Sequence, residues 1–246
     1  TTGTLNVAMG RNALSSGAIT NKNVAIGNNT LQSVDCDSSV DSLNTAVGFS
    51  AGGAVTTGTE NTFVGARTGG NLQGGDHNVY IGENIDASAV GVDSEIMIGS
   101  GTGAGTNTVR IQTAGGASTL GLDGSDTSWA ASSDLRLKTD VATCAVGLDF
   151  IKDLRPITFK WNAKDAVANT LPQYNADSSD PVYGSGKTQH GFIAQEVKTA
   201  INAHSGLKNG FTMWREDPDG TQEVAPAALI PMLTKALQEL SAKNDA

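Results

Sequence analysis

The sequence has few of the residues on which metal sites, disulfide frameworks and one large core depend. Its two cysteines, Cys36 and Cys144, lie far apart, which gives neither a metal-binding spacing nor a disulfide framework. We therefore expect free thiols, no metal and no cofactor. Aromatic residues make up 5% of the 246 residues while glycine occurs 30 times, which argues against one well-packed core over the whole length.

Positive charge and long apolar runs are also scarce. The net charge of −9 and the isoelectric point near 4.7 argue against nucleic acid and anionic membranes as partners, because both favour a basic patch. No apolar run is long enough for membrane insertion, and the first residues lack the features of a signal peptide. Since the chain does not start with Met and enters a repeat at once, we expect a C-terminal piece of a longer protein.

The composition changes sharply in front of Ser133. The first 132 residues hold 23 of the 30 glycines and 15 charged residues. The last 114 residues hold 7 glycines, 26 charged residues and all six prolines. We therefore expect a repetitive part over residues 1–112, a linker over 113–132 and a second domain over 133–246.

The first part repeats a short apolar unit that ends in Gly. The units are NVAMG (6–10), NVAIG (23–27), NTAVG (44–48), NTFVG (61–65), NVYIG (78–82) and the degenerate EIMIG (95–99). Their closing glycines are 17, 21, 17, 17 and 17 residues apart, and the longer spacing contains the insertion SVDCDSS. A relic, NTVRI from Asn107, ends the array. Apolar residues alternate within the units, as at Val7 and Met9, which predicts short strands.

The regular spacing predicts stacked β coils of about 17 residues. The closing Gly permits a positive φ where the chain turns, and Asn tolerates the same conformation at the opposite end of the unit. One coil buries too few side chains to offset the entropy of ordering its backbone, so coils must stack on each other and chains beside each other. A disordered Gly/Ser-rich stalk is the alternative, but such a stalk would not keep a strand in every repeat.

The repeats carry a pattern, N-x-A-hydrophobic-G followed by small residues and Gly. Over residues 1–112 this pattern resembles the head repeats of trimeric autotransporter adhesins and of related phage tail fibres. The resemblance implies a trimeric β-roll or β-helix shaft, whereas composition alone does not give the number of chains.

Four further motifs follow in the second part. They are SDLRLK (133–138), GLDFIKDLRPITFKW (147–161), HGFIAQEV (190–197) and APAALIPMLTKALQEL (225–240). In this order they resemble the endosialidase-type intramolecular chaperone, the self-cleaving C-terminal domain of phage tail spikes and fibres. The resemblance implies an α+β domain that trimerises, helps the upstream β structure to fold and then releases itself. It also implies a cut between Ser132 and Ser133, with Ser133 as nucleophile, Lys138 as general base and a functional role for His190.

A Ser–Lys pair has a chemical rationale at this position. A serine hydroxyl needs a neighbouring base, and lysine serves only when neutral, which burial or nearby positive charge favours. Arg136 could supply that charge, or it could pair with Asp134 or Asp140. We keep Asp134, Arg136 and His190 as supporting candidates, although a lone histidine is usually structural. Because Ser133 follows the scissile bond, its hydroxyl can attack the preceding carbonyl, so the covalent connection supplies most of the positioning.

The five-residue spacing sets a geometric condition on this pair. Residues five apart point to opposite faces of a strand and lie about 140° apart on a helix. Either the chain bends between Ser133 and Lys138, which we favour, or the two residues pair between neighbouring chains. The competing structural explanation is that Ser133 and Asp134 form a helix N-cap in front of an exposed basic segment.

The second part also contains signals for ordinary elements. We expect a helix over 190–204, hairpin strands at 211–214 and 222–225, and a helix at the C-terminus. Apolar residues at spacings of 4, 3 and 4 form a short coiled-coil-like seam: Leu229, Leu233, Ala236 and Leu240. Such a seam either closes a trimer or packs within its own domain.

These features predict a mainly β repeat shaft followed by an α+β chaperone domain, in the C-terminal part of a phage tail fibre or spike. The expected partners are further copies in a homotrimer, the upstream fibre of the same chain, and a host surface receptor or glycan. We expect the shaft in the virion, and the chaperone domain, a single-turnover serine endopeptidase, released in the host cytoplasm during assembly. The alternative is a permanent trimeric adhesin without cleavage. A glycan-cleaving enzyme is disfavoured because no carboxylate pair stands out.

Overall fold

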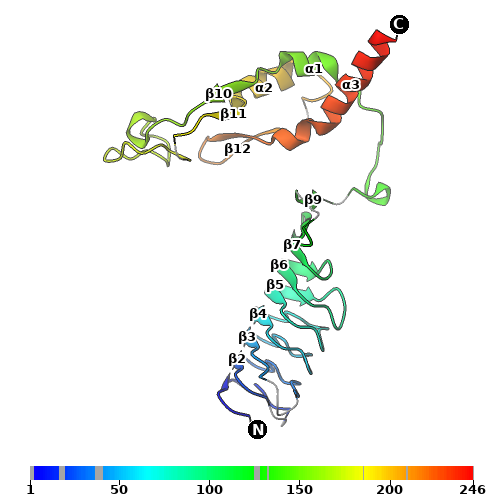
Figure 1. Ribbon diagram of the computed structural model, residues 1–246, viewed down its shortest axis with the longest axis vertical. Helices are drawn as coiled ribbons and strands as arrows, with labels where there is room; N and C mark the ends of the chain where they lie inside the picture. The colour runs from blue at the N-terminus through cyan, green and yellow to red at the C-terminus, as the bar shows by residue number, and fades with distance from the viewer. Residues whose placement is uncertain are drawn as a thin grey trace. The chain divides into compact units, whose positions relative to one another are not determined.

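The computed structural model describes residues 3–16, 20–36, 41–124, 128–131, 133–184, 186–208 and 210–245. The chain forms two compact units, Thr1–Lys138 and Thr139–Ala246, and each is described by itself (Figure 1). Among the described residues, no helix has the length and apolar character needed to cross a membrane.

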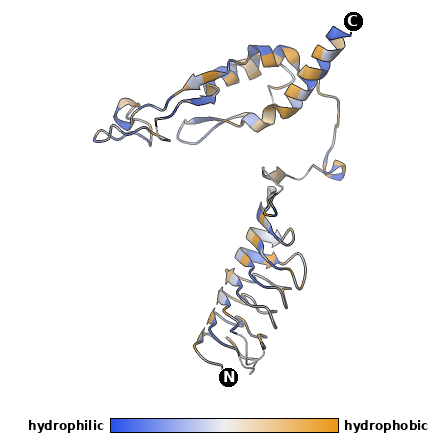
Figure 2. Cartoon of the chain, viewed as in Figure 1, coloured by the Kyte–Doolittle hydropathy of each residue, from blue (hydrophilic) through white to orange (hydrophobic). Residues whose placement is uncertain are grey.

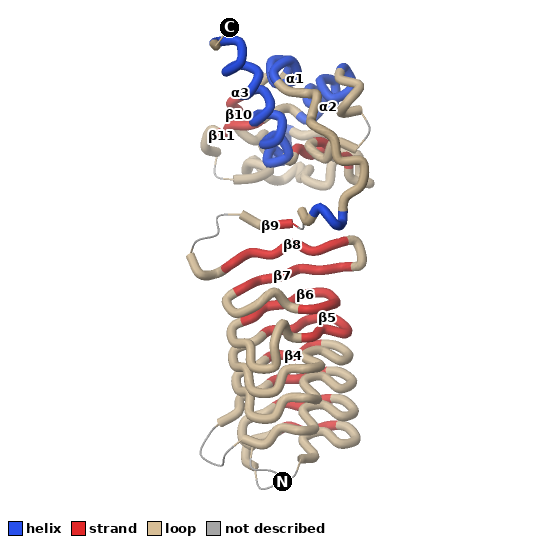
Figure 3. The backbone as a smooth tube through the Cα atoms, turned by 90° about the vertical axis from the view of Figure 1, so that its right-hand side faces the viewer, coloured by secondary structure: helices blue, strands red, loops and turns tan. Residues whose placement is uncertain are grey.

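The first unit is a parallel β-solenoid, which confirms the stacked coils expected from the repeats. Its strands follow one another in sequence order within one sheet (Figure 3). They are β1 (Val7–Met9), β2 (Val24–Ile26), β3 (Thr45–Val47), β4 (Thr62–Val64), β5 (Val79–Asp86), β6 (Glu95–Thr102) and β7 (Thr108–Thr113). Each pairs in parallel with the next, and equivalent positions of the repeat lie opposite each other, as Ala46 lies opposite Phe63.

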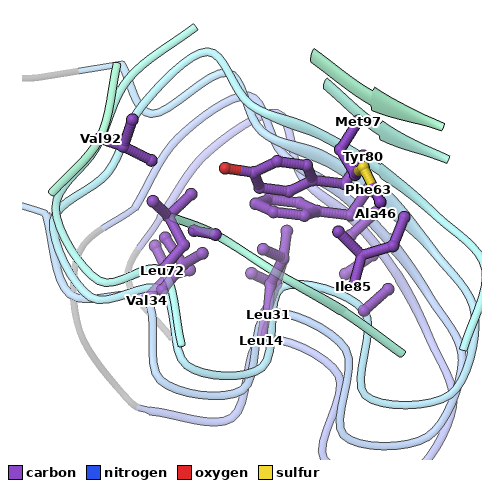
Figure 4. Close-up of a cluster of buried hydrophobic side chains, with 14 of the residues drawn as sticks. Leu14, Leu31, Val34, Ala46, Phe63, Leu72, Tyr80, Ile85, Val92 and Met97 are labelled. Atoms are coloured by element: carbon purple, nitrogen blue, oxygen red, sulfur yellow. The ribbon is translucent and has the colours of Figure 1, made fainter. Parts of the chain in front are cut away.

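From β2 to β6 the middle residue of the five-residue repeat unit points into the solenoid. These side chains are fully buried: Ala25, Ala46, Phe63, Tyr80 and Met97. The ring centroids of Phe63 and Tyr80 lie 5.8 Å apart, and the two rings pack next to each other in the interior (Figure 4). Each of the first four coils turns a corner four residues after the closing Gly of its unit. The coils of Ala46 and Phe63 have Gly52 and Gly69 at this corner, where the two earlier coils have Leu14 and Leu31. A Cβ at Gly69 would lie 2.3 Å from the Phe63 ring. The Phe63 ring is therefore matched by glycine at the facing corner of its own coil and of the preceding coil.

The alternating apolar residues on either side of the middle position face outward. One of the two resulting rows, here called the outer apolar column, runs in register along the strands: Met9, Ile26, Val47, Val64, Ile81, Ile98 and Ile111. Most of these side chains are exposed, for example 40% at Ile81 and 45% at Ile111. A single chain therefore leaves a long apolar surface on its sheet.

The turn role assigned to the repeat asparagines is wrong for the first five units, although it holds at Asn107, where φ is +57°. In those five units the positive φ falls on the residue in front of Asn: Leu5, Lys22, Leu43, Glu60 and His77. The asparagines themselves point inward, and those at positions 23, 44, 61 and 78 are at most 1% exposed. Their carboxamides form a ladder in which each Oδ1 accepts the backbone N–H of its counterpart in the next coil, at 2.8 to 3.0 Å.

The solenoid ends in a different arrangement. Glu95 takes the place of the repeat asparagine and is fully buried. Its carboxylate accepts hydrogen bonds from the Tyr80 hydroxyl at 2.8 Å and from two backbone N–H groups, of Ser88 at 3.1 Å and Gly105 at 2.6 Å. After β7 the chain reverses, and β8 (Gly116–Gly121) and β9 (Ala130–Ala131) add antiparallel strands. These strands lie within 113–132, the segment expected to be a linker.

The second unit is a small α+β structure with a C-terminal helix, as expected. Its elements are α1 (Leu148–Asp153), β10 (Ile157–Phe159), η2 (Lys164–Ala166), β11 (Gln189–Gly191), α2 (Ala194–Ala203), β12 (Trp214–Glu216), β13 (Gln222–Val224), η3 (Pro226–Leu229) and α3 (Ile230–Asn244). The helix expected over 190–204 is found as α2, but His190 and Gly191 belong to β11 instead. The expected hairpin is found in β12 and β13, which pair antiparallel, with its first strand at 214–216 and not at 211–214. The core gathers around Phe150, Val197 and Met213.

Apolar residues occur along the whole length of helix α3 (Figure 2), and some are buried while others are exposed. Ala236, together with Leu229 just before the helix, is buried against its own unit. A second row remains exposed by 46 to 68%: Ile230, Leu233, Leu237 and Leu240. The expected seam is therefore divided, because Leu229 and Ala236 serve the unit's own core while Leu233 and Leu240 lie on the exposed face.

Candidate functional site

The segment from Ser133 to Lys138 forms a tight turn at the end of the first unit. Residues Leu135–Leu137 form a 3-10 helix, η1, whose N-cap is Asp134. The backbone N–H of Leu137 donates to the backbone carbonyl oxygen of Asp134 at 3.1 Å, and the backbone N–H of Lys138 donates to that of Leu135 at 3.0 Å. An extended conformation at Asp134 and again at Lys138 bounds the turn on each side.

This turn brings the two expected catalytic residues together. Lys138 Nζ donates a hydrogen bond to Ser133 Oγ at 2.7 Å. The contact lies within one chain and results from a bend, which is the first of the two alternatives that the five-residue spacing left open. The same distance would serve proton transfer from the hydroxyl to a neutral amine.

Arg136 pairs with Asp134, one of the two acids considered for it. Its Nη2 lies 2.5 Å from Asp134 Oδ2, and its Nε lies 3.0 Å from Oδ1. The Arg136 side chain, followed by its backbone N–H, holds the pKa of Asp134 below the ordinary aspartate value. The Asp134 carboxylate in turn raises the pKa of Arg136. The guanidinium of Arg136, which is the positive charge nearest to Lys138 in sequence, is therefore neutralised by the carboxylate of Asp134.

The pair lies on an open surface in the single chain. Ser133, Asp134 and Lys138 are exposed, and so are the apolar side chains of Leu135 and Leu137, at 69% and 75%. The expected cut involves Ser132, which lies outside the described residues. The geometry of attack on the scissile carbonyl is thus not part of the described site.

His190 belongs to the second unit. It lies on β11 opposite Thr158 of β10 and is exposed. It lines a groove of about 920 Å³, beside an aromatic row in which Phe159, Trp161 and Tyr183 pack edge to face with ring centroids 5.1 and 4.9 Å apart. Sequence reasoning missed this groove, although Trp161 and Tyr183 are rare aromatic residues at the two ends of a polar loop.

Other chemical groups of the described residues do not form a metal or disulfide site. No group of three or more His, Cys, Asp or Glu side chains among them could hold a metal ion. Cys36 is buried and Cys144 partly buried, and both are free. Burial is the main cause that raises the pKa of the Cys36 thiol, so this thiol is poorly suited to act as a nucleophile.

Comparison with known proteins gives one match. Residues 133–206 match the family described as chaperone of endosialidase. This match supports an endosialidase-type chaperone domain, and at the level of the family it implies self-cleaving activity of the serine type. A search of curated proteins and a search of solved structures found no match to the chain. The matched segment begins at Ser133, the residue that accepts the hydrogen bond from Lys138.

Proposed function

We propose that this chain is the C-terminal part of a phage tail fibre or spike, because an endosialidase-type chaperone domain follows a β-solenoid in its sequence. Its second domain assists assembly of the shaft and then releases itself by one cut between Ser132 and Ser133. The observation that carries this proposal is the 2.7 Å contact between Lys138 Nζ and Ser133 Oγ at the first residue of the family match.

The proposed cut proceeds in two steps. In the first, neutral Lys138 takes the proton of Ser133 Oγ as this oxygen attacks the carbonyl carbon of Ser132. The peptide C–N bond then breaks as the Ser133 nitrogen takes up a proton, which leaves an ester between the two residues. In the second step water hydrolyses the ester, giving a carboxylate on Ser132 and restoring the hydroxyl of Ser133.

Trimerisation is part of the proposal, and two exposed apolar surfaces support it. The outer apolar column and the exposed row on α3 each extend over several turns of structure, which is unusual for a chain that stays alone in water. Packing three chains along these surfaces would remove the apolar side chains from water. It would also shield Leu135 and Leu137 if the turn lies near the interface, and a drier environment favours neutral lysine.

Intact-mass spectrometry of freshly purified parent protein and of Ser133→Ala tests the cut. We expect two fragments that meet between Ser132 and Ser133 in the parent, and one full-length chain in Ser133→Ala and Lys138→Ala. A parent that stays full-length after prolonged incubation would instead favour the permanent adhesin. Mixed trimers of Ser133→Ala and Lys138→Ala chains test whether the pair forms within one chain or between chains. Cleaved product in these trimers would mean that Ser133 of one chain pairs with Lys138 of another.

Sedimentation analysis tests the trimer separately. The double variant Ile81→Asp and Ile98→Asp places two charges in the outer apolar column, so we expect it to lower the sedimenting mass from trimer to monomer. Thr57→Asp, at an exposed position outside the column, is the control and should stay trimeric. A trimeric double variant would remove the column from the proposed interface.

A further inference from the structure

Asp134 holds Arg136 and the turn around it through several hydrogen bonds. Its Oδ1 accepts from the backbone N–H of Arg136 at 2.9 Å and from Nε at 3.0 Å. Its Oδ2 accepts from Nε at 3.1 Å and from Nη2 at 2.5 Å. The first of these bonds caps η1, while the other three form a forked ion pair. Asp134 therefore makes two separable contributions, a cap and a charge contact.

We propose that Asp134 is a positioning residue for self-cleavage, whose carboxylate acts as the N-cap of the turn that presents Lys138 to Ser133. The inference rests on the proposed function. The hydrogen bonds described for its carboxylate are all to Arg136. None of these described bonds is to Ser133 or Lys138, so we infer that the carboxylate affects the pair through the backbone of the turn that it caps.

The turn has little else to hold it. None of the residues from 133 to 138 is buried, so no core packing fixes their conformation. A 3-10 helix of three residues has poor hydrogen-bond geometry and forms only in short pieces. An exposed turn of this kind depends on its cap, and removal of an N-cap shifts the local equilibrium by about 2- to 30-fold. The ratio of chains with Lys138 next to Ser133 to chains without this contact should change by the same factor, and the cleavage rate by up to that factor.

The cap and the ion pair can be tested apart by substitution. Asn and Ser cap as well as Asp does, but they carry no charge, whereas Ala offers neither function. Arg136→Ala removes the ion pair and keeps the backbone N–H that Asp134 caps. Asp149→Ala removes one negative charge from an exposed position on α1 and is the matched control for net charge.

The experiment follows cleavage in time after the full chain is refolded from denaturant, with the uncut fraction measured by intact mass. We expect Asp134→Ala to cleave about 2- to 30-fold more slowly than the parent. Asp134→Asn, Asp134→Ser, Arg136→Ala and Asp149→Ala should stay within about threefold of the parent rate, which is the smaller end of a cap effect. Rescue by Asn and Ser is the result that a general folding defect would not give.

Two results would overturn the inference. Cleavage of Asp134→Ala at the parent rate would mean that the cap does not limit the approach of Lys138. Asn and Ser variants as slow as Ala would mean that the charge of Asp134 acts instead of the cap. If Asp134→Ala does not refold, the comparison of Asn and Ser with Arg136→Ala decides between cap and charge. A parent that never cleaves, or a Ser133→Ala chain that does, would refute the proposed function instead, so the two failures are distinguishable.

Discussion

Loss of one rung of the asparagine ladder should destabilise the shaft far more than loss of an ordinary surface amide. Asn61 lies in the middle of the array and is 1% exposed. Its Nδ2 donates to the carbonyl of Gly75 at 2.8 Å. Its Oδ1 accepts the backbone N–H of Asn78 at 2.8 Å and the Nδ2 of Asn78 at 3.0 Å. Asn61→Ala removes all of these bonds and leaves their partners inside the solenoid.

The expected magnitude follows from the groups left without a partner. The substitution leaves two buried backbone groups, the Gly75 carbonyl and the Asn78 N–H, without the side chain that satisfied them. Each such group costs about 1 to 3 kcal/mol, so the free energy of unfolding should fall by about 2 to 6 kcal/mol. Asn28→Ala is the matched control, because its buried Oδ1 has no hydrogen-bond partner among the residues that the structure describes. We expect that change to lie within about 0.5 kcal/mol of the parent or to stabilise it slightly.

Guanidinium unfolding followed by far-ultraviolet circular dichroism measures both changes. All chains should carry Ser133→Ala so that one covalent species is compared, and all should be at the same concentration because assembly affects stability. If Asn61→Ala and Asn28→Ala shift the midpoint equally, the buried hydrogen bonds of the ladder do not stabilise the coils. An unchanged Asn61→Ala chain would mean that water enters and replaces the lost groups.

Three further predictions concern the interior and the second unit. Phe63→Ala should cost about 3 to 5 kcal/mol by creating a cavity, whereas Phe49→Ala, at a side chain that is 48% exposed, should cost much less in the same unfolding assay. Gly69→Ala should destabilise the parent, because φ is +69° and the new Cβ would lie 2.3 Å from the Phe63 ring, but it should cost less in a Phe63→Ala background; equal costs in both would contradict the matching of ring and glycine. Glu239 accepts the N–H of Leu148 at 2.9 Å, and this bond is the main cause that lowers the pKa of Glu239. A lowered carboxylate pKa stabilises the fold above the ordinary glutamate range, and the benefit is lost as pH falls through the lowered value. Glu239→Gln should therefore melt below the parent at about pH 6 and approach it at about pH 3, on the two sides of the ordinary glutamate pKa; a constant gap in melting temperature would contradict this.

Much of the shaft could be predicted because its signals are local and repeated. Alternation of apolar residues and a glycine at a fixed interval are enough to predict strands and their stacking. The role of the asparagines was missed because Asn tolerates a positive φ, and local tolerance was taken as the reason for its presence. A better signal lay in the same repeats: Asn recurs, while the residue in front of it varies from Leu to Lys, Glu and His. A constant polar residue beside a variable one suggests an interior contact.

The candidate site was predictable in part. The five-residue spacing of Ser133 and Lys138 excluded a regular helix or strand, and a bend brings the two side chains together in the single chain, while pairing between chains stays a question for the mixed-variant experiment. The N-cap was treated as a competing explanation for the same residues. In the structure Asp134 caps the turn and Ser133 contacts Lys138, so the cap and the pair occur together. Which acid pairs with Arg136 depends on the turn geometry, so sequence left Asp134 and Asp140 open.

The division of the C-terminal seam could not be derived from spacing. The same heptad-like pattern fits a helix packed on its own domain and a helix packed on other chains. The outcome depends on which face α1 covers, and α1 is distant in sequence from α3. Leu229 and Ala236 are covered, while Leu237, outside the expected seam, is the most exposed apolar residue of the row at 68%.

The changing interior of the solenoid has a consequence for the order of its coils. A stack of identical coils could loop out one repeat and close again without penalty, because each neighbour would fit every other. Here the inward residues differ from coil to coil, from Ala46 to Phe63 to Tyr80, and Gly52 and Gly69 are shaped around a single ring. If the coil of Phe63 were skipped, Gly69 would be lost with it and the Tyr80 ring, with its additional hydroxyl, would face Gly52 in place of Phe63. Fitting a larger side chain into a packed interior costs about 1 to 3 kcal/mol. The backbone repeat thus sets the spacing of the coils, while the irregular interior makes one sequence of coils more stable than its shortened copies.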